Sequence, residues 1–528
     1  MRGFQFLWLP LLVFFILSCQ STEQNTEERK KPNIIFIMTD DHAFQAISAY
    51  GSELIQTPNI DKLAQEGMLF DRAYVTNSIC APSRAVVLTG KHSHLNGLTD
   101  NAVRFDSTQV TLPRLMQEGG YKTAVIGKWH LKTQPMGFDY WKVLPGQGHY
   151  YNPEFRTQNG RVVDTGYVTD LITDFSLEWL DENKDGNQPF MLMYQHKAPH
   201  REWLAKPKYF KEFTQKEFPV PSTLFDNYEN RGNAAREAEM RIADHMGLTN
   251  DSKIKPEIAE ELGHSDFMSW YTNAYRNNLD RMNREQRSAW DNIYDPINKE
   301  FKGAGMSGED LTRWKYQRYM QDYLASIASV DENIGRLMDY LKENNLEENT
   351  VVIYTSDQGF YLGEHGWFDK RFMYEESFRT PLIIKWPGVV KPGSINSDLV
   401  QNLDFAETIL DMAGNPIPDA MQGSSLVPLL KGEKPIWRKA LYYHYYEYPG
   451  IHAVKRHIGA ATDRYKIIHF YNDIDEWELY DLQEDPQEMY NVYGQEEYAE
   501  IQTEMHEILL DLARVYEDSV GLEQAQFK

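Results

Sequence analysis

The chain has 528 residues, which is enough for one large domain and a smaller one. Its 78 acidic and 54 basic side chains give a formal net charge of −24. This charge argues against nucleic acid as a partner, because nucleic acid is itself strongly anionic. An anionic ligand would therefore have to be held by a local cluster of cations.

The first residues have the pattern of an export signal. Arg2 precedes an apolar stretch, residues 4–17, that is short for a membrane-spanning helix. The ending Ile16-Leu17-Ser18-Cys19 resembles the bacterial lipoprotein box, in which the Cys is lipidated; a plain secretory signal cleaved nearby is the alternative. We expect a signal peptide at 1–18, a flexible tether at 19–31, and a lipid anchor at Cys19 in the bacterial cell envelope, on the periplasmic or surface face of the outer membrane.

The first predicted strand, residues 33–38, is a continuous apolar run of the kind that is buried on both faces of a sheet. Asp40 and Asp41 follow it. Two carboxylates at the carboxyl end of a central strand lie where open α/β sheets place their sites, and such ligands favour Ca²⁺ or Mg²⁺. A solvated turn is the alternative.

Residues 59–67 are predicted to form a short helix and residues 68–74 a strand. The next motif, residues 78–90, places Cys80 just before a helix that Pro82 begins. Helix N-termini receive anions, and Arg84 lies one turn further on. The chain has two Cys residues, so a lipidated Cys19 leaves Cys80 without a disulfide partner. A buried, inert thiol is the alternative reading.

Two further buried-type strands are predicted before residue 205. After a helix at 112–119, the strand at 121–126 leads to Lys128 and His130. After an amphipathic helix at 168–180, the strand at 190–195 leads to Lys197 and His200.

Residues 205–310 are polar and indicate a largely helical insertion that could wall a substrate cleft. A long helix at 314–345 and a two-faced strand at 350–355 follow, and the strand ends at Asp357 and Gln358. Lys370 lies in the block after it.

Strands and helices alternate from residue 33 to about 415, which predicts an α/β fold with a mostly parallel central sheet between helices. We place this domain at 32–430. Short strands at 441–446, 466–471 and 476–480 and a helix at 496–516 predict a smaller C-terminal subdomain of antiparallel sheet plus helix at 431–528. His452, Arg456 and His457, on an expected loop there, are candidates for sugar contact.

The block from Cys80 to Gly90 resembles the signature of the sulfatase family, Cys-x-Pro-Ser-Arg followed by Leu-Thr-Gly. Residues 127–130 and 198–200, with the Asp40-Asp41 pair, match further blocks of that family, and the resemblance spans about residues 32–490. It implies that a formylglycine-generating enzyme oxidises Cys80 to formylglycine (3-oxoalanine), whose hydrate is the nucleophile.

The resemblance also implies the roles of the other residues. One Ca²⁺ per chain would be bound by Asp40, Asp41, Asp357, Gln358 and the modified Cys80. Gln358 stands where the family often has Asn, and its amide oxygen can still coordinate but sits one methylene further out. The catalytic group would comprise Cys80, Arg84, Lys128, His130, His200 and Lys370. Of these, His200 would face the leaving-group oxygen, while Lys197 is a weaker candidate for substrate contact.

The expected activity is hydrolysis of sulfate esters on a sulfated polysaccharide or its oligosaccharides. The polymer could be algal, such as ulvan, or a host glycosaminoglycan. A phosphatase or phosphodiesterase of the same alkaline-phosphatase-like superfamily, or a lipoprotein that binds sulfated glycans without catalysis, would be the alternatives.

Overall fold

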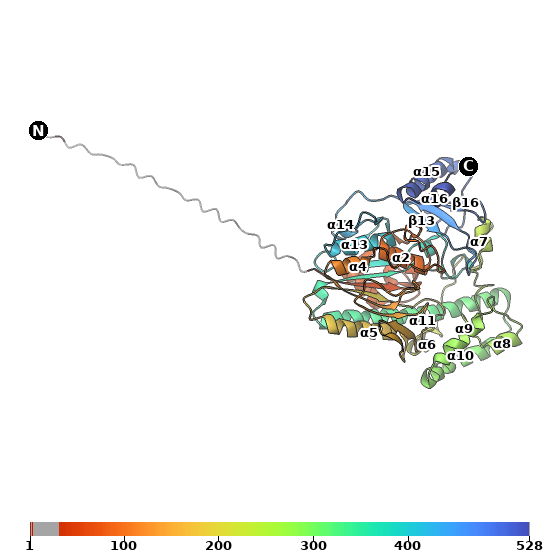
Figure 1. The fold of residues 1–528 in the computed structure, drawn as a ribbon. Helices are drawn as coiled ribbons and strands as arrows, with labels where there is room; N and C mark the ends of the chain where they lie inside the picture. Colours follow the sequence, from red (N-terminus) through yellow and green to blue (C-terminus); the bar gives the residue numbers. More distant parts are fainter. Residues whose placement is uncertain (2, 4–30, 527–528) are drawn as a thin grey trace.

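A ten-stranded sheet forms the centre of the protein in the computed structural model, which describes residues 1, 3 and 31–526 (Figure 1). The strand order is β11-β2-β10-β9-β1-β8-β4-β5-β6-β7. The strands are β1 (Asn33–Thr39), β2 (Met68–Phe70), β4 (Lys122–Lys128), β5 (Tyr140–Leu144), β6 (Glu154–Thr157), β7 (Gly160–Val163), β8 (Phe190–Gln195), β9 (Thr350–Ser356), β10 (Leu382–Lys385) and β11 (Ser394–Asn396). A separate pair joins β3 (Ala73–Tyr74) to β12 (Val400–Gln401).

The middle of this sheet is parallel. The neighbours β9, β1, β8, β4 and β5 all run in the same direction, while β10, β6 and β7 pair antiparallel toward the two edges. Every residue of β1 is buried, as its continuous apolar run predicts. The expected α/β class with a mostly parallel sheet is confirmed.

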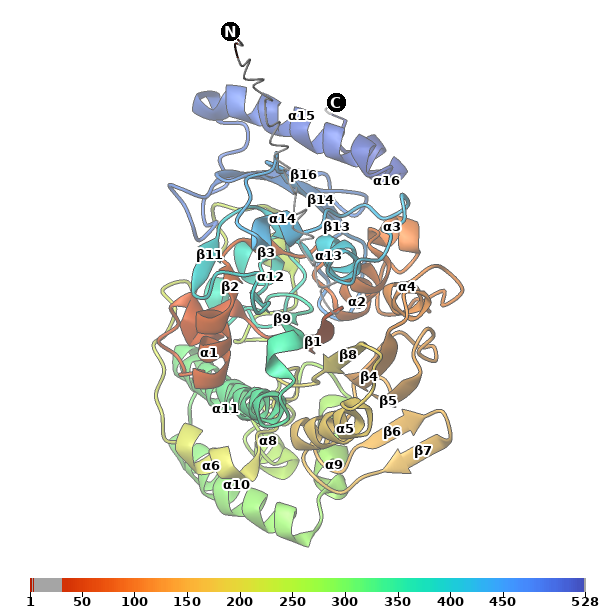
Figure 2. The ribbon, with the colours of Figure 1, turned by 90° about the vertical axis from the view of Figure 1, so that its left-hand side faces the viewer.

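Alternate side chains of β1 enter two different cores. Ile35 and Ile37 pack with α5 (Val168–Asn183) and α11 (Gly308–Glu343) on one face of the sheet. Ile34 and Phe36 pack on the other face, toward α2 (Cys80–Thr89), α4 (Leu112–Glu118) and α13 (Phe405–Met412). Figure 2 shows these two helical layers below and above the strands.

The C-terminal part has its own sheet. Four antiparallel strands occur in the order β13 (Leu441–Tyr445), β14 (His457–Ala461), β15 (Tyr465–Phe470) and β16 (Glu476–Asp481), covered by α15 (Ala499–Val515) and α16 (Ser519–Gln524). The expected antiparallel subdomain with a helix is confirmed, whereas its exact boundary at 430/431 stays a prediction. Within residues 31–526, together with 1 and 3, no helix is both long and apolar enough to cross a membrane.

The regular elements that lie wholly between residues 205 and 310 are helices joined by long loops. The helices are α6 (Pro207–Phe213), α7 (Asn233–Glu237), α8 (Pro256–Glu261), α9 (Tyr271–Arg281) and α10 (Arg284–Ala304). In Figure 1 α8–α10 lie at the lower right of the molecule, and the C-terminal sheet with α15 lies at the upper right. The remaining short helices are α1 (Pro58–Glu66), α3 (Ser93–Asn96), α12 (Glu375–Phe378), α14 (Val427–Leu430), η1 (Phe44–Ala46), η2 (Ser48–Tyr50), η3 (Glu347–Asn349), η4 (Glu364–Gly366), η5 (Asn402–Asp404) and η6 (Glu496–Tyr498).

Candidate active site

The parallel strands β9, β1, β8 and β4 end at one edge of the sheet, and the expected site residues follow these ends. Parallel neighbours bring their carboxyl ends together, so residues more than 300 positions apart in sequence become adjacent. The residues that follow or end these strands are Asp357 and Gln358 (β9), Asp40 and Asp41 (β1), Lys197 and His200 (β8), and Lys128 and His130 (β4).

Three carboxylates form the centre of this site. One oxygen each of Asp40, Asp41 and Asp357 lies within 4.8 Å of the others, and all three residues are buried. Burial raises the pKa of Asp41 to about 7 and that of Asp357 to about 6. Burial acts on Asp40 in the same direction, but the charges of His200 and Lys128 outweigh it and hold this pKa well below its usual range.

This arrangement fits a divalent cation. Asp40 Oδ1 and Gln358 Oε1 are buried oxygens without a hydrogen-bond partner, and a bound cation would satisfy them. Carboxylate and amide oxygens are the ligands that hard cations prefer. The extra methylene of Gln358 therefore does not keep its side chain out of the cluster, because its Nε2 reaches Asp41 Oδ1.

Two lysines face the carboxylates from different parts of the chain. Lys128 Nζ pairs with Asp40 Oδ2, and Lys370 Nζ lies 2.6 and 2.8 Å from the two oxygens of Asp41. Both lysines are nearly inaccessible to solvent. They provide fixed positive charge beside the carboxylates, in a protein whose overall charge is negative.

Arg84 is held rigidly by the ends of two strands. Its Nε lies 3.0 Å from Asp357 Oδ2, and its Nη1 donates to Gln195 Oε1 at 2.7 Å. The sequence reasoning missed Gln195. A polar residue that closes the apolar run of β8 is the signal that could have identified it.

Cys80 is the first residue of α2 and is buried. The expectation placed it just before a helix that Pro82 begins, whereas the helix begins two residues earlier, at Cys80, with Ile79 as its N-cap. Burial raises the pKa of the Cys80 thiol far above its ordinary value, so an unmodified thiol there is protonated and a poor nucleophile.

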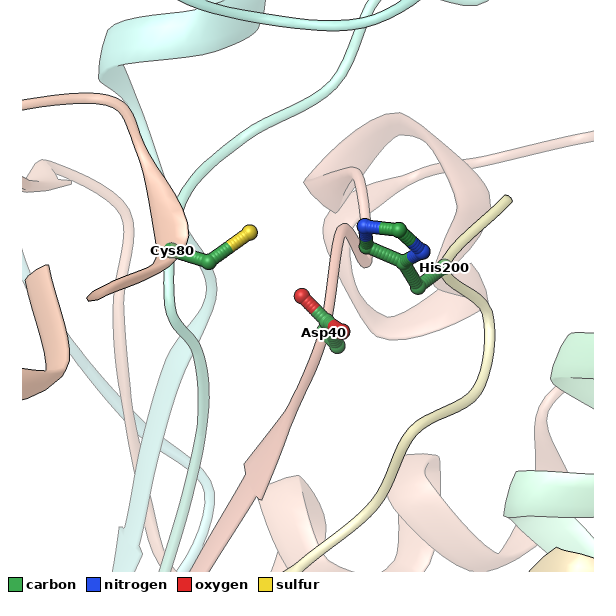
Figure 3. Close-up of side chains that lie close together, drawn as sticks. All are labelled: Asp40, Cys80 and His200. Carbon is green, nitrogen blue, oxygen red and sulfur yellow. The ribbon is translucent and has the colours of Figure 1, made fainter. Parts of the chain in front are cut away.

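The Cys80 side chain points toward Asp40 and the His200 ring (Figure 3). One ligand atom from each of these three residues lies within 4.8 Å of the others. The sulfur therefore occupies the place where a group on residue 80 meets both the carboxylates and the histidine.

The two histidines differ in their partners. His200 Nδ1 lies 2.5 Å from the carbonyl oxygen of Arg201, which leaves Nε2 toward the site, 3.7 Å from Asp41 Oδ2. His130 Nδ1 is buried without a hydrogen-bond partner. Burial lowers the pKa of both imidazoles, and the charge of Lys128 lowers that of His130 further.

Three weaker candidates for substrate contact lie in different surroundings. Lys197 is buried with Nζ 4.7 Å from the centre of the Tyr150 ring, and burial lowers its pKa to about 8. His452 is also buried, and its Nε2 lies 3.3 Å from Asp369, the neighbour of Lys370.

Arg456 makes its contacts within the C-terminal subdomain. It pairs with Asp473 at 3.1 Å and donates to the carbonyl oxygens of Tyr446 and Tyr448. These bonds order the loop after β13. The roles assigned to these residues stay predictions, and Cys19 lies outside the described residues.

Known proteins resemble the chain over nearly its whole length. The profile of the family described as Sulfatase matches residues 32–415, and the profile described as N-sulphoglucosamine sulphohydrolase, C-terminal, matches residues 363–515. The N-acetylglucosamine-6-O-sulfatase of Bacteroides thetaiotaomicron is 50% identical over 519 residues, which cover 97% of this chain and 91% of that protein. The human N-acetylglucosamine-6-sulfatase is 26% identical over 465 residues, with 83% and 71% covered.

A solved structure is also similar to this chain. It shows a protein in complex with its substrate, D-glucosamine-2-N,6-O-disulfate, and it is similar to this chain with a TM-score of 0.89 and 49% identity. The similarity covers 94% of this chain and 100% of that one. This chain therefore belongs to the sulfatase family and is a sulfate ester hydrolase, rather than the phosphatase or non-catalytic glycan-binding protein that the sequence left as alternatives.

Proposed function

We propose that the protein hydrolyses the 6-O-sulfate ester of glucosamine residues in sulfated glycosaminoglycans or their oligosaccharides. The observation that carries this proposal is the 50% identity to an N-acetylglucosamine-6-O-sulfatase across 97% of the chain. The likeness to a structure that holds glucosamine disulfate supports the same sugar. Of the two polymer classes expected from the sequence, the host glycosaminoglycan is therefore preferred over algal ulvan.

The residues at the sheet edge meet the demands of this reaction. Lys128 and Lys370 lie where they can bind the non-bridging oxygens of the sulfate group and stabilise the charge that develops there. Once His200 is protonated at both nitrogens, Nδ1 remains bonded to the Arg201 carbonyl, and Nε2 can give its proton to the departing sugar oxygen.

Residue 80 would act after maturation. We propose that a formylglycine-generating enzyme converts Cys80 to the aldehyde, whose hydrate supplies the hydroxyl that attacks sulfur. The position of Cys80 beside Asp40 and His200 supports this, as does the protonated state of the unmodified thiol. Arg84, fixed on Asp357, would favour the deprotonated form of that hydroxyl.

The metal would be Ca²⁺, held by Asp40, Asp41, Asp357 and Gln358. Oxygen ligands without sulfur or imidazole favour such a hard cation, which polarises the sulfate when bound. We further propose, from the sequence of residues 1–31 alone, that the protein is exported and anchored through lipid at Cys19.

Sulfate release from defined sugars tests the proposed activity. The protein is produced with a formylglycine-generating partner and Ca²⁺, and is offered N-acetylglucosamine-6-sulfate, glucosamine-2-N,6-O-disulfate, galactose-6-sulfate and sulfated ulvan oligosaccharides. We expect release from the two glucosamine sugars and none from the Cys80→Ala variant. Release from the ulvan fragments alone would contradict the proposed substrate.

Mass spectrometry complements this assay. An aldehyde on the peptide that contains Cys80 confirms maturation, and a diacylglyceryl N-terminus at Cys19 confirms the anchor. A protein that keeps its thiol and nevertheless releases sulfate would contradict the role of formylglycine.

A further inference from the structure

A buried loop of the helical insertion, residues 247–254, contacts the two residues that follow His200. Asp251 forms a two-pronged ion pair with Arg201, with Nε–Oδ1 at 2.6 Å and Nη2–Oδ2 at 2.5 Å. The Asp251 side chain is inaccessible to solvent, and that of Arg201 is 8% exposed. A buried pair with this geometry restrains both partners far more than a surface pair does.

Lys253 makes a second connection from the same loop. Its ammonium group is buried and donates to the carbonyl oxygen of Glu202 at 2.6 Å, and also to those of Asn250 and Asp251. Lys253 adopts a left-handed φ of 63°, which is uncommon for a residue with a side chain. The loop thus has a costly backbone conformation at Lys253, the residue whose ammonium group reaches the Glu202 carbonyl.

These contacts bear on the orientation of the His200 ring. The ring is held at Nδ1 by the carbonyl of Arg201, at 2.5 Å, and the His200 carbonyl accepts a hydrogen bond from Tyr150 at 2.6 Å. The Arg201 guanidinium also stacks over the Tyr271 ring of α9 at 4.6 Å. The position of the imidazole therefore depends on where the insertion holds Arg201 and Glu202.

We propose that Asp251 and Lys253 are positioning residues for His200, and that the insertion orients the proton donor to the leaving group. This inference rests on the proposed function, in which His200 protonates the sugar oxygen. A misplacement of about 1 Å can cost on the order of 100-fold in rate. Removing the contacts that Asp251 and Lys253 make with Arg201 and Glu202 should therefore slow the step in which the leaving oxygen is protonated.

The reaction offers a readout that a purely structural role would not move. A sugar alkoxide must be protonated as it leaves, whereas the phenolate of 4-nitrophenyl sulfate leaves without a proton. Removing these contacts should therefore slow hydrolysis of N-acetylglucosamine-6-sulfate and leave that of the aryl sulfate nearly unchanged. Loss of fold, maturation or metal would lower both rates together.

The main variant is the double substitution Arg201→Gln with Asp251→Asn, because it removes the ion pair without leaving a buried charge unpaired. Lys253→Met tests the second connection. The matched control is Asp266→Asn. Asp266 accepts from Leu248 N of the same loop at 2.7 Å, and its hydrogen bonds go to Leu248 and Thr249 instead of to Arg201 or Glu202. His200→Ala provides the reference pattern.

We expect the double variant to lose about 10- to 100-fold in kcat/KM on the sugar sulfate and to stay within about threefold of wild type on the aryl sulfate. The control should stay within about threefold on both substrates. An equal loss on both substrates, or none, in the double variant overturns the proposal. A crystal structure of the double variant with the His200 ring at its wild-type place, 3.7 Å from Asp41, overturns it as well.

Failure of the proposed function would give a different result from failure of the positioning role. A wild-type enzyme that releases no sulfate from N-acetylglucosamine-6-sulfate contradicts the proposed substrate, whatever the variants do. If His200→Ala loses the same factor on both substrates, His200 is not the proton donor, and the positioning role is overturned with it.

Discussion

The carboxyl edge of the central sheet and the helical insertion serve one site in different ways. At the edge, Asp40, Lys128 and Asp357 each lie within one residue of the strand end that carries them. The insertion holds the residues after His200 through Asp251 and Lys253, about 50 positions away in sequence. The sheet edge supplies the reacting groups, and the insertion restrains one of them.

The largest effect should come from the edge. Cys80→Ala removes the nucleophile and should lower kcat on N-acetylglucosamine-6-sulfate by on the order of 10⁶-fold, since no other group replaces it. Thermal unfolding should change little, because the side chain loses only one atom. Free sulfate and circular dichroism are the measurements. A folded Cys80→Ala protein that still releases sulfate would show that residue 80 is not the nucleophile.

A smaller loss should follow removal of a cation at the same edge. Lys370→Met deletes the ammonium beside Asp41 and should cost about 10²- to 10³-fold in kcat, the usual size for one group that stabilises developing charge.

Lys466→Met is the matched control for Lys370. Lys466 of the C-terminal subdomain is equally buried, but it pairs with Glu375 of α12 and with Glu488. Its loss should lower stability and leave the kcat of the folded fraction unchanged. Equal kcat losses in the two lysine variants would show that the effect is not specific to the site.

The insertion core should respond in stability instead. Trp290 of α10 is buried, stacks on Tyr294 at 3.9 Å between ring centres, and meets Phe210 of α6 edge-on. Trp290→Ala should therefore cost about 3–5 kcal/mol in unfolding free energy, measured by denaturant titration. The kcat of the folded fraction should stay near wild type. A large fall in kcat would mean that the insertion acts through its whole packing and not through the loop at 247–254.

Sequence patterns predicted β1, β4, β8 and β9 of the parallel core because each contains an apolar run that is buried. The fifth parallel strand, β5, was not predicted, since Tyr140 and Lys142 are only partly buried and interrupt the run. The missed strands lack that pattern. All four residues of β7 are exposed, and β14 has the sequence His-Ile-Gly-Ala-Ala, in which Gly and Ala hide the alternation. His457, expected on a loop, therefore lies in a strand.

The site residues at strand ends could be anticipated for the same topological reason. Residues that meet only through tertiary packing could not. Asp251 and Arg201 carry no local signal of their pairing, because a polar loop and a charged residue after Pro199-His200 look solvated in sequence. Both side chains are buried only because the insertion packs against the loop at residues 197–204.

The last prediction concerns the buried carboxyl group of Glu407 on α13, a helix that packs against α2. Glu407 of α13 accepts a hydrogen bond from Gly423 N at 2.7 Å, and one of its oxygens is buried without a partner. Burial, with the charge of Asp404, raises its pKa from 4.5 to about 8. A raised pKa means that the folded state binds the proton more tightly, so this contribution to stability is complete below about pH 4.5 and is lost as pH rises through about 8.

Glu407→Gln should remove that dependence. The variant should gain about 3–4 kcal/mol in unfolding free energy relative to wild type as the pH rises from about 5 to about 8, because most of the pKa shift is titrated in that range at about 1.4 kcal/mol per unit. Urea titrations at the two pH values measure the change. Asp411→Asn, an exposed position on the same helix, should show no such change. A difference between variant and wild type that does not grow with pH would mean that Glu407 is already ionised in the folded protein, and that the helix behind Cys80 tolerates a buried charge.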